Sequence, residues 1–139
     1  MNKSKLQELK YYKIAYEVAK GKHKRLSEQA CNLSQQLKEI PVKTGSHKNY
    51  IEWQLIELSE AYDYMLKAKK EYDEKLANVV NIVNQINDKR LKLILELRYI
   101  DCLEWQDIAE RMNLSLSYVY TLHGWALVDF IKVQEKKEG

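Results

Sequence analysis

The sequence predicts an all-α protein, in which a long antiparallel coiled-coil helical hairpin is followed by a small helix-turn-helix domain. Its 139 residues include one proline and four glycines, so few positions disfavour a helix. Two long stretches repeat apolar residues at alternating spacings of three and four, which is the pattern of a coiled coil. The last third of the chain carries the capping and turn residues of two closely joined helices.

The first long stretch predicts the first arm of the hairpin, and only His23 interrupts its apolar alternation. The predicted seam consists of Leu9, Tyr12, Tyr16, Ala19, His23, Leu26, Ala30, Leu33, Leu37 and Ile40. The residues that follow, 41–49, contain Pro41 and a Thr-Gly-Ser run, which predicts a loop.

The second stretch predicts the returning arm, so that residues 1–86 form the hairpin, and only Lys69 interrupts its alternation. Its predicted seam consists of Ile51, Leu55, Leu58, Tyr62, Met65, Lys69, Tyr72, Leu76, Val79, Val83 and Ile86. Folding the chain back about the loop brings Ile40 opposite Ile51. The same register brings His23 opposite Lys69, so the two interruptions are predicted to coincide.

Basic residues surround both interruptions of the seam. They are Lys20, Lys22, Lys24, Arg25, Lys67, Lys69 and Lys70. One interpretation is a patch that binds phosphates or an acidic protein surface. The alternative is a solvated, lysine-rich face with no ligand, and the sequence leaves both open.

Residues 87–131 predict the helix-turn-helix domain, which begins with a helix from Asp88 to Tyr99. The polar residues 132–139 are predicted to be a flexible tail.

The motif itself rests on turn and cap residues. Ile108 and Met112 lie on one face of a helix, with the small Ala109 beside them, so a second helix can cross closely. Asn113 ends that helix, because asparagine tolerates the left-handed conformation, and Ser115 is a favourable N-cap for the next one. The buried face of the second helix is predicted to be Val119, Leu122, Ala126 and Phe130.

Three segments of this domain resemble region four of bacterial sigma factors, the part that meets the promoter −35 element. The segments are Leu95–Tyr99, Trp105–Glu110 and Ser115–Leu127. The ending Tyr120–Leu127 is more similar still to small phage proteins that combine this module with an N-terminal helical hairpin, the RinA- or ArpU-like phage transcriptional regulators. Only residues 91–127 carry specific similarity; the hairpin matches by length and pattern.

The resemblance implies a phage or prophage transcription regulator, an activator of phage genes that acts in the cytoplasm of the bacterial host. Its expected partners are double-stranded promoter DNA, host RNA polymerase and a second copy of the chain bound through the coiled coil. The residues that match the DNA-reading positions of sigma factors are Ser115, Leu116, Ser117, Tyr118, Tyr120, Thr121 and Trp125.

The charge of this region departs from the sigma pattern, which has Arg, Glu and Gln at the positions that match Leu116, Ser117, Tyr118, Tyr120 and Thr121, and another Arg at the position of Trp125. No Lys or Arg occurs between Met112 and Ile131. Since phosphate neutralisation supplies much of the affinity for DNA, the motif is expected to need a partner or oligomerisation. Two other functions therefore stay open: a protein-interaction module that no longer reads DNA, and a small terminase-like DNA-packaging protein.

Other chemistry is not indicated. None of the common nucleotide-binding, metalloprotease or hydrolase motifs occurs, so no enzyme activity and no cofactor are expected. Cys31 and Cys102 match no metal-ligand spacing, and the histidines are scattered, so no metal site is predicted. No apolar run reaches the ~20 residues that cross a membrane. A net charge of +3 is too small to indicate nucleic-acid binding by itself.

Overall fold

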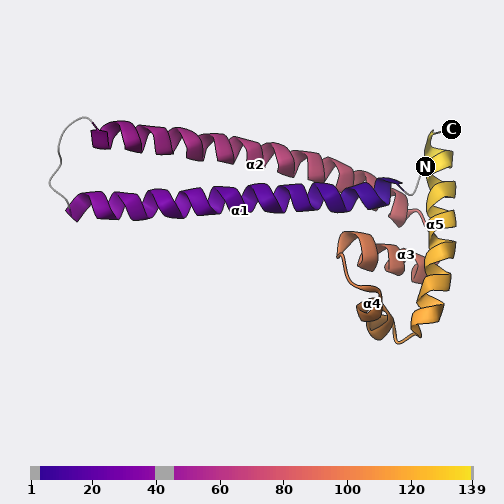
Figure 1. Cartoon of the computed structure of the whole chain (residues 1–139). Coiled ribbons are helices and arrows are strands. Elements are labelled where there is room, and N and C mark those ends of the chain that lie inside the picture. The colour runs from indigo at the N-terminus through magenta and orange to yellow at the C-terminus, as the bar shows by residue number, and fades with distance from the viewer. Residues whose placement is uncertain (1–3, 40–45, 139) are drawn as a thin grey trace. The chain divides into compact units, whose positions relative to one another are not determined.

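The computed structural model describes residues 4–39 and 46–138, and every regular element in those ranges is a helix, as predicted (Figure 1). The helices are α1 (Ser4–Glu39), α2 (Ser46–Asn84), α3 (Lys89–Leu95), the π-helical η1 (Glu96–Ile100), α4 (Trp105–Met112) and α5 (Leu116–Glu138). No described helix combines the length and the apolar character needed to cross a membrane.

The chain divides into two compact units, Lys13–Glu71 and the combination of Met1–Tyr12 with Tyr72–Gly139. This division differs from the predicted boundary between residues 86 and 87. In the second unit, the start of the chain and residues 72–139 share one hydrophobic core. This core holds Leu6, Leu9, Val79, Ile82, Val83, Ile86, Leu91, Ile94, Leu95, Ile108, Ala109, Val119, Leu122, Ala126 and Phe130. The start of α1 and the end of α2 therefore belong with the C-terminal helices, because they bury their apolar side chains in the same core.

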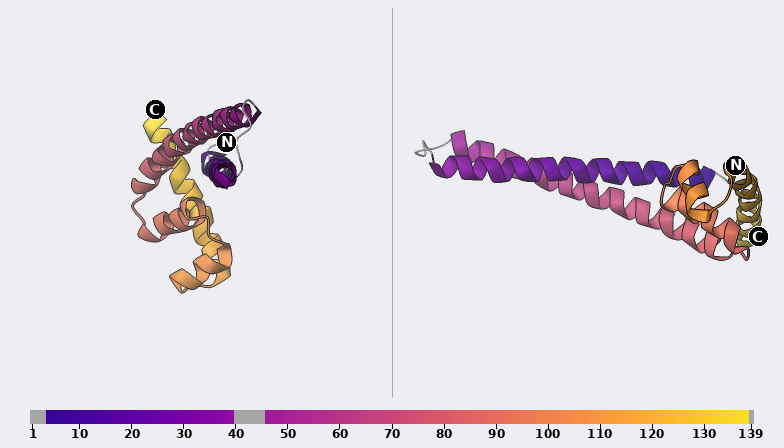
Figure 2. Two further views of the ribbon diagram at one scale, coloured as in Figure 1. Left: turned by 90° about the vertical axis from the view of Figure 1, so that its left-hand side faces the viewer. Right: turned by 90° about the horizontal axis from the view of Figure 1, so that it is seen from below.

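Within the unit Lys13–Glu71, the arms of α1 and α2 run antiparallel (Figures 1 and 2). The predicted face of α1 is confirmed from Tyr16 to Ala30, since Ala19 is buried and Tyr16, His23, Leu26 and Ala30 are half-buried. The predicted seam positions Leu37 and Ile40 lie outside the residues whose side chains are described.

The returning arm packs through a neighbouring face. In place of Tyr62 and Lys69, which are exposed, Ala61 and Ala68 are buried. The alanines allow the other arm to approach more closely, while the lysine keeps its charge in water. The prediction that Lys69 lies in the seam is therefore wrong.

The predicted register of the two arms is also wrong. The ring of His23 lies 5.4 Å from the ring of Tyr62, and Lys69 is two turns, about 10 Å, further along α2. The cause is the start of α2 at Ser46, inside the predicted loop of residues 41–49. His23 and Tyr62 lie equally far along the chain from the midpoint between Glu39 and Ser46. Residues 41–45 of that loop lie outside the described residues.

The C-terminal segment corrects a further prediction. Residues 132–138 continue α5 instead of forming a flexible tail. Val133 packs against the core, and Gln134 is only 2% exposed. The prediction failed because the segment is mostly polar, so its composition gave no sign that Val133 and Gln134 face the core.

The helix predicted from Asp88 to Tyr99 is present in two parts. The Asp88 side chain accepts a hydrogen bond of 2.9 Å from the backbone N–H of Arg90, which caps the start of α3. From Glu96 the helix widens into η1, where the N–H of Asp101 donates to the carbonyl of Glu96 at 3.0 Å. The i to i+5 bond is the pattern of a π-helix, which is found mostly as single turns.

Candidate nucleic-acid interface

The turn between α4 and α5 is built by Asn113. Its φ of 57° and ψ of 46° confirm the left-handed conformation predicted for this residue. The N–H of Asn113 donates to the carbonyl of Glu110 at 3.2 Å, and that of Leu114 to the carbonyl of Ala109 at 3.0 Å. Carbonyls that the end of α4 would otherwise leave unpaired are thereby satisfied, and the chain turns within three residues.

Ser115 then starts α5. Its side-chain oxygen accepts a hydrogen bond of 3.1 Å from the backbone N–H of Tyr118, as an N-cap does. Behind the helix, Val119, Leu122 and Ala126 are fully buried in the core that also holds Ile108 and Ala109. Ser115, which was predicted to contact DNA, therefore has a structural role in capping the helix.

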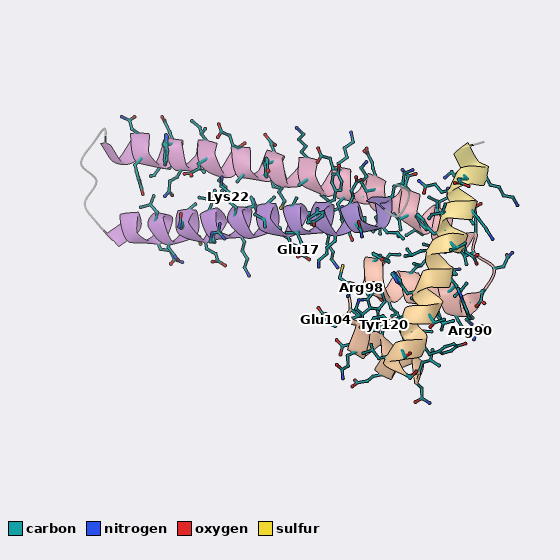
Figure 3. The ribbon with its side chains drawn as sticks, turned by 45° about the vertical axis from the view of Figure 1, so that its right-hand side comes forward. Glu17, Lys22, Arg90, Arg98, Glu104 and Tyr120 are labelled. Atoms are coloured by element: carbon teal, nitrogen blue, oxygen red, sulfur yellow. The ribbon has the colours of Figure 1, made fainter. Side chains whose placement is uncertain are left out.

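The opposite side of α5 faces solvent. Ser117 and Thr121 are exposed, Tyr120 is 49% exposed and Trp125 is 53% exposed. Their successive spacings of three, one and four residues group them on one side of the helix, where Figure 3 labels Tyr120. The Thr121 hydroxyl donates to the Ser117 carbonyl at 3.3 Å. The exposed side therefore offers hydroxyls and aromatic rings but no charge.

Two of the residues predicted to contact DNA lie at the edge of the exposed side of α5. Leu116 is exposed at the first turn of α5. Tyr118 is half-buried, and its hydroxyl accepts a hydrogen bond of 2.7 Å from Nη1 of Arg90.

Arg90 is a residue of this surface that the sequence did not reveal. Its guanidinium also lies 3.6 Å from the Asp88 carboxylate. The pKa of Arg90 is raised above its ordinary value by Tyr118 first and by Asp88 second, so the side chain stays charged. The contact holds an exposed positive charge beside the first turns of α5, and 28 residues separate the two partners in sequence.

An aromatic cluster supports Tyr120 from behind. The ring of Trp105 lies 5.5 Å from the ring of Tyr120 in an edge-on arrangement and 4.5 Å from the ring of His123. The guanidinium of Arg98 lies over Trp105 at 4.4 Å and donates to the carbonyl of Leu103 at 3.0 Å. Aromatic pairs and cation–π contacts of this kind restrict side-chain rotation, so Tyr120 is held in place before any ligand binds.

Tyr99 completes the cluster. Its hydroxyl lies 2.7 Å from Nε2 of His123. Burial raises the pKa of Tyr99, and the nearby Arg98 opposes that shift. Just beyond η1, Cys102 adopts a left-handed φ of 57°, a conformation that is uncommon for cysteine and was not predicted.

The predicted basic patch does not form one surface. All seven side chains are exposed, but residues two apart on a helix, such as Lys22 and Lys24, point about 200° apart. Lys22 also shares a groove with Glu57 and Glu60. The positive charge is thus spread around the arms and is partly accompanied by carboxylates.

No group of three or more histidine, cysteine or acidic residues in the described ranges is arranged to hold a metal ion. Comparison with known proteins gives one family match: residues 33–130 match the family described as Protein of unknown function (DUF1492). No curated protein and no solved structure was found to match the chain.

Proposed function

We propose that this chain, which belongs to the family of proteins of unknown function DUF1492, is a transcription regulator that binds promoter DNA through α4 and α5. In this proposal the two helices are a sigma region-four-like helix-turn-helix, and the arms of α1 and α2 form a coiled-coil hairpin. The resemblance of Trp105–Glu110 and Ser115–Leu127 to sigma factors and to RinA- or ArpU-like regulators supports it.

The observation that carries the proposal is the free side of α5. A helix enters a major groove when a second helix supports it from behind and its first turns stay accessible. Here α4 is joined to α5 by a three-residue turn, while Ser117, Tyr120 and Thr121 remain exposed. Hydroxyl groups donate to or accept from base edges and phosphates, and an aromatic edge or a threonine methyl can contact the thymine methyl group.

The electrostatics of the surface support a regulator that acts with a partner. Arg90 is the basic side chain fixed beside α5, and the exposed side of the helix itself is neutral. One fixed cation supplies far less affinity than the several phosphate contacts of an ordinary DNA-binding domain. We therefore propose that the protein binds its promoter together with host RNA polymerase or as an oligomer, in the bacterial cytoplasm, and that it activates phage genes.

The test is binding to duplex DNA selected from a random pool, measured by fluorescence anisotropy against a shuffled duplex. Tyr120→Ala is expected to bring the two affinities closer together, because the supported ring at the centre of the exposed side is lost. Tyr11→Ala is the matched control, since Tyr11 is an exposed tyrosine on α1. Failure of the selection to enrich any sequence, with and without polymerase, would contradict the proposal.

A second candidate is a protein-interaction module that keeps the same scaffold without reading DNA. Leu116, Tyr120, Trp125 and Val128 are all more than one-third exposed on α5, and aromatic residues are enriched in protein interfaces. Co-purification from host lysate with and without nuclease separates the two candidates. A partner that survives nuclease and is lost with Trp125→Ala, while helical circular dichroism is unchanged, favours this second function.

A further inference from the structure

The unit Lys13–Glu71 leaves an unusual amount of apolar surface in water. Seven large apolar side chains in the described part of α2 are between 42% and 63% exposed: Tyr50, Trp53, Leu55, Ile56, Tyr62, Tyr64 and Leu66. The buried contacts between the two arms are small by comparison, since the buried apolar positions in the described part of this unit are Ala19, Ala61 and Ala68. Trp53, Ile56 and Tyr64 share one side of α2, whereas Leu55, Tyr62 and Leu66 lie on the opposite side. A group of exposed apolar side chains such as Trp53, Ile56 and Tyr64 indicates an interaction site.

Part of this surface is hollowed into a groove of about 440 Å³. Lys22 of α1 lines one side of it, and the rest is lined by Trp53, Ile56, Glu57, Glu60, Ala61 and Tyr64 of α2. Figure 3 labels Lys22 on α1. The groove therefore combines two exposed aromatic rings with a basic residue from one arm and two acidic residues from the other.

We propose that this groove is a self-association surface and that its occupant is the same surface of a second copy of the chain. A two-fold interface requires a surface that is complementary to itself. This one is, because α1 supplies Lys22, with Arg25 one turn further on the same side, while α2 supplies Glu57 and Glu60. Stacking each α1 on the α2 of the other copy joins opposite charges and encloses Trp53 and Tyr64.

The charges also decide which arms of the two copies pack against each other. Placing like arms together would bring Lys22 against Lys22 and Glu57 and Glu60 against themselves, which is repulsive. Placing unlike arms together makes every neighbouring helix antiparallel, as in an up-down four-helix bundle. The exposed aromatic side chains then become core residues, which explains why a helix pair with such a small interior keeps them.

The experiment is sedimentation velocity on the full chain without DNA, so that its outcome is independent of the proposed promoter binding. The wild type is expected to form a concentration-dependent dimer. Lys22→Glu and the double variant E57K/E60K are each expected to weaken the dimer by about tenfold or more, because like charges then face each other. Mixing the two variants in equal amounts is expected to restore it, since opposite charges meet again across the mixed interface.

Lys24→Glu is the matched control, because it makes the same charge change on the other side of α1. Circular dichroism of every variant checks that the helices are retained. A wild type that stays monomeric at its highest soluble concentration would overturn the inference. So would charge variants that dimerise like the wild type, or a mixture that remains monomeric.

Discussion

The salt dependence of DNA binding is the sharpest quantitative prediction for the proposed interface. The basic side chains of α3 and α4 are Lys89, Arg90, Lys92 and Arg111, which are exposed except for the half-buried Lys92, and we take all four as candidate phosphate contacts. Arg98 is half-buried and lies over Trp105. The first basic residue of α5 is Lys132, about 16 Å beyond Thr121 along the helix.

These four positions set an upper limit for each protomer. Each neutralised phosphate contributes about 0.9 to the slope of log K against log salt, so four contacts give a slope of about −3.6. Between about 50 and 200 mM salt the affinity should then fall by no more than about 150-fold. An ordinary domain with six to ten phosphate contacts loses about 10³ to 10⁵ over the same range.

Fluorescence anisotropy on one duplex across a salt series measures this slope. Arg90→Ala is expected to reduce its magnitude by about 0.9, because one contact is lost, whereas Arg90→Lys retains the charge and the slope. Lys137→Ala, at the exposed end of α5, serves as the control. A slope clearly steeper than about −3.6 per protomer, or one that Arg90→Ala leaves unchanged, would refute the reasoning and assign the phosphate contacts to the α1 and α2 arms.

Three further predictions concern the stability of the scaffold. Gln134 is buried and its Oε1 has no hydrogen-bond partner in the described part of the chain. Gln134→Met should therefore raise the free energy of unfolding, measured by urea denaturation, by about 1 kcal/mol. A decrease would show that the oxygen is paired. Asn113→Ala should lower the free energy of unfolding by about 1 kcal/mol, because alanine is strained at the positive φ of this position. Asn113→Gly should not lower it, because glycine adopts a positive φ without strain. Equal losses of stability in the two variants would contradict this prediction. The raised pKa of Tyr99 means that its contribution to stability is complete below its unfolded pKa of about 10 and is lost as the pH rises through the higher folded value. Tyr99→Phe should therefore be less stable than the wild type at neutral pH, through loss of the contact with His123, and the difference should narrow in alkaline solution. Parallel stability curves would argue against it.

Local signals were enough to predict the helices and the turn of the candidate site. Asn113 and Ser115 act on backbone groups one to three residues away, so their roles follow from the side chains themselves. The inward face of α1 was also predictable, because the apolar stripe from Leu9 to Ala30 is much longer than the exposed one formed by Tyr11, Ile14 and Val18.

The α2 arm carries two overlapping stripes, and the sequence pattern favoured the larger side chains. Ala61 and Ala68 face inward because the distance between the arms decides which stripe fits, and that distance depends on both helices together. The same dependence explains the register, since a shift in the start of α2 to Ser46 moves every pair along the arms.

The amino-acid sequence by itself determined the all-helical class, the turn between α4 and α5, and the neutral, aromatic character of the exposed side of α5. Only the tertiary structure decided that Arg90 meets Tyr118, that Trp105 supports Tyr120, and that Gln134 is buried. Helix propensity, caps and apolar periodicity act over a few neighbouring residues and can be read in order along the chain. The contacts that position the site join residues 15 to 28 positions apart, and they exist only once the core has brought separate helices together.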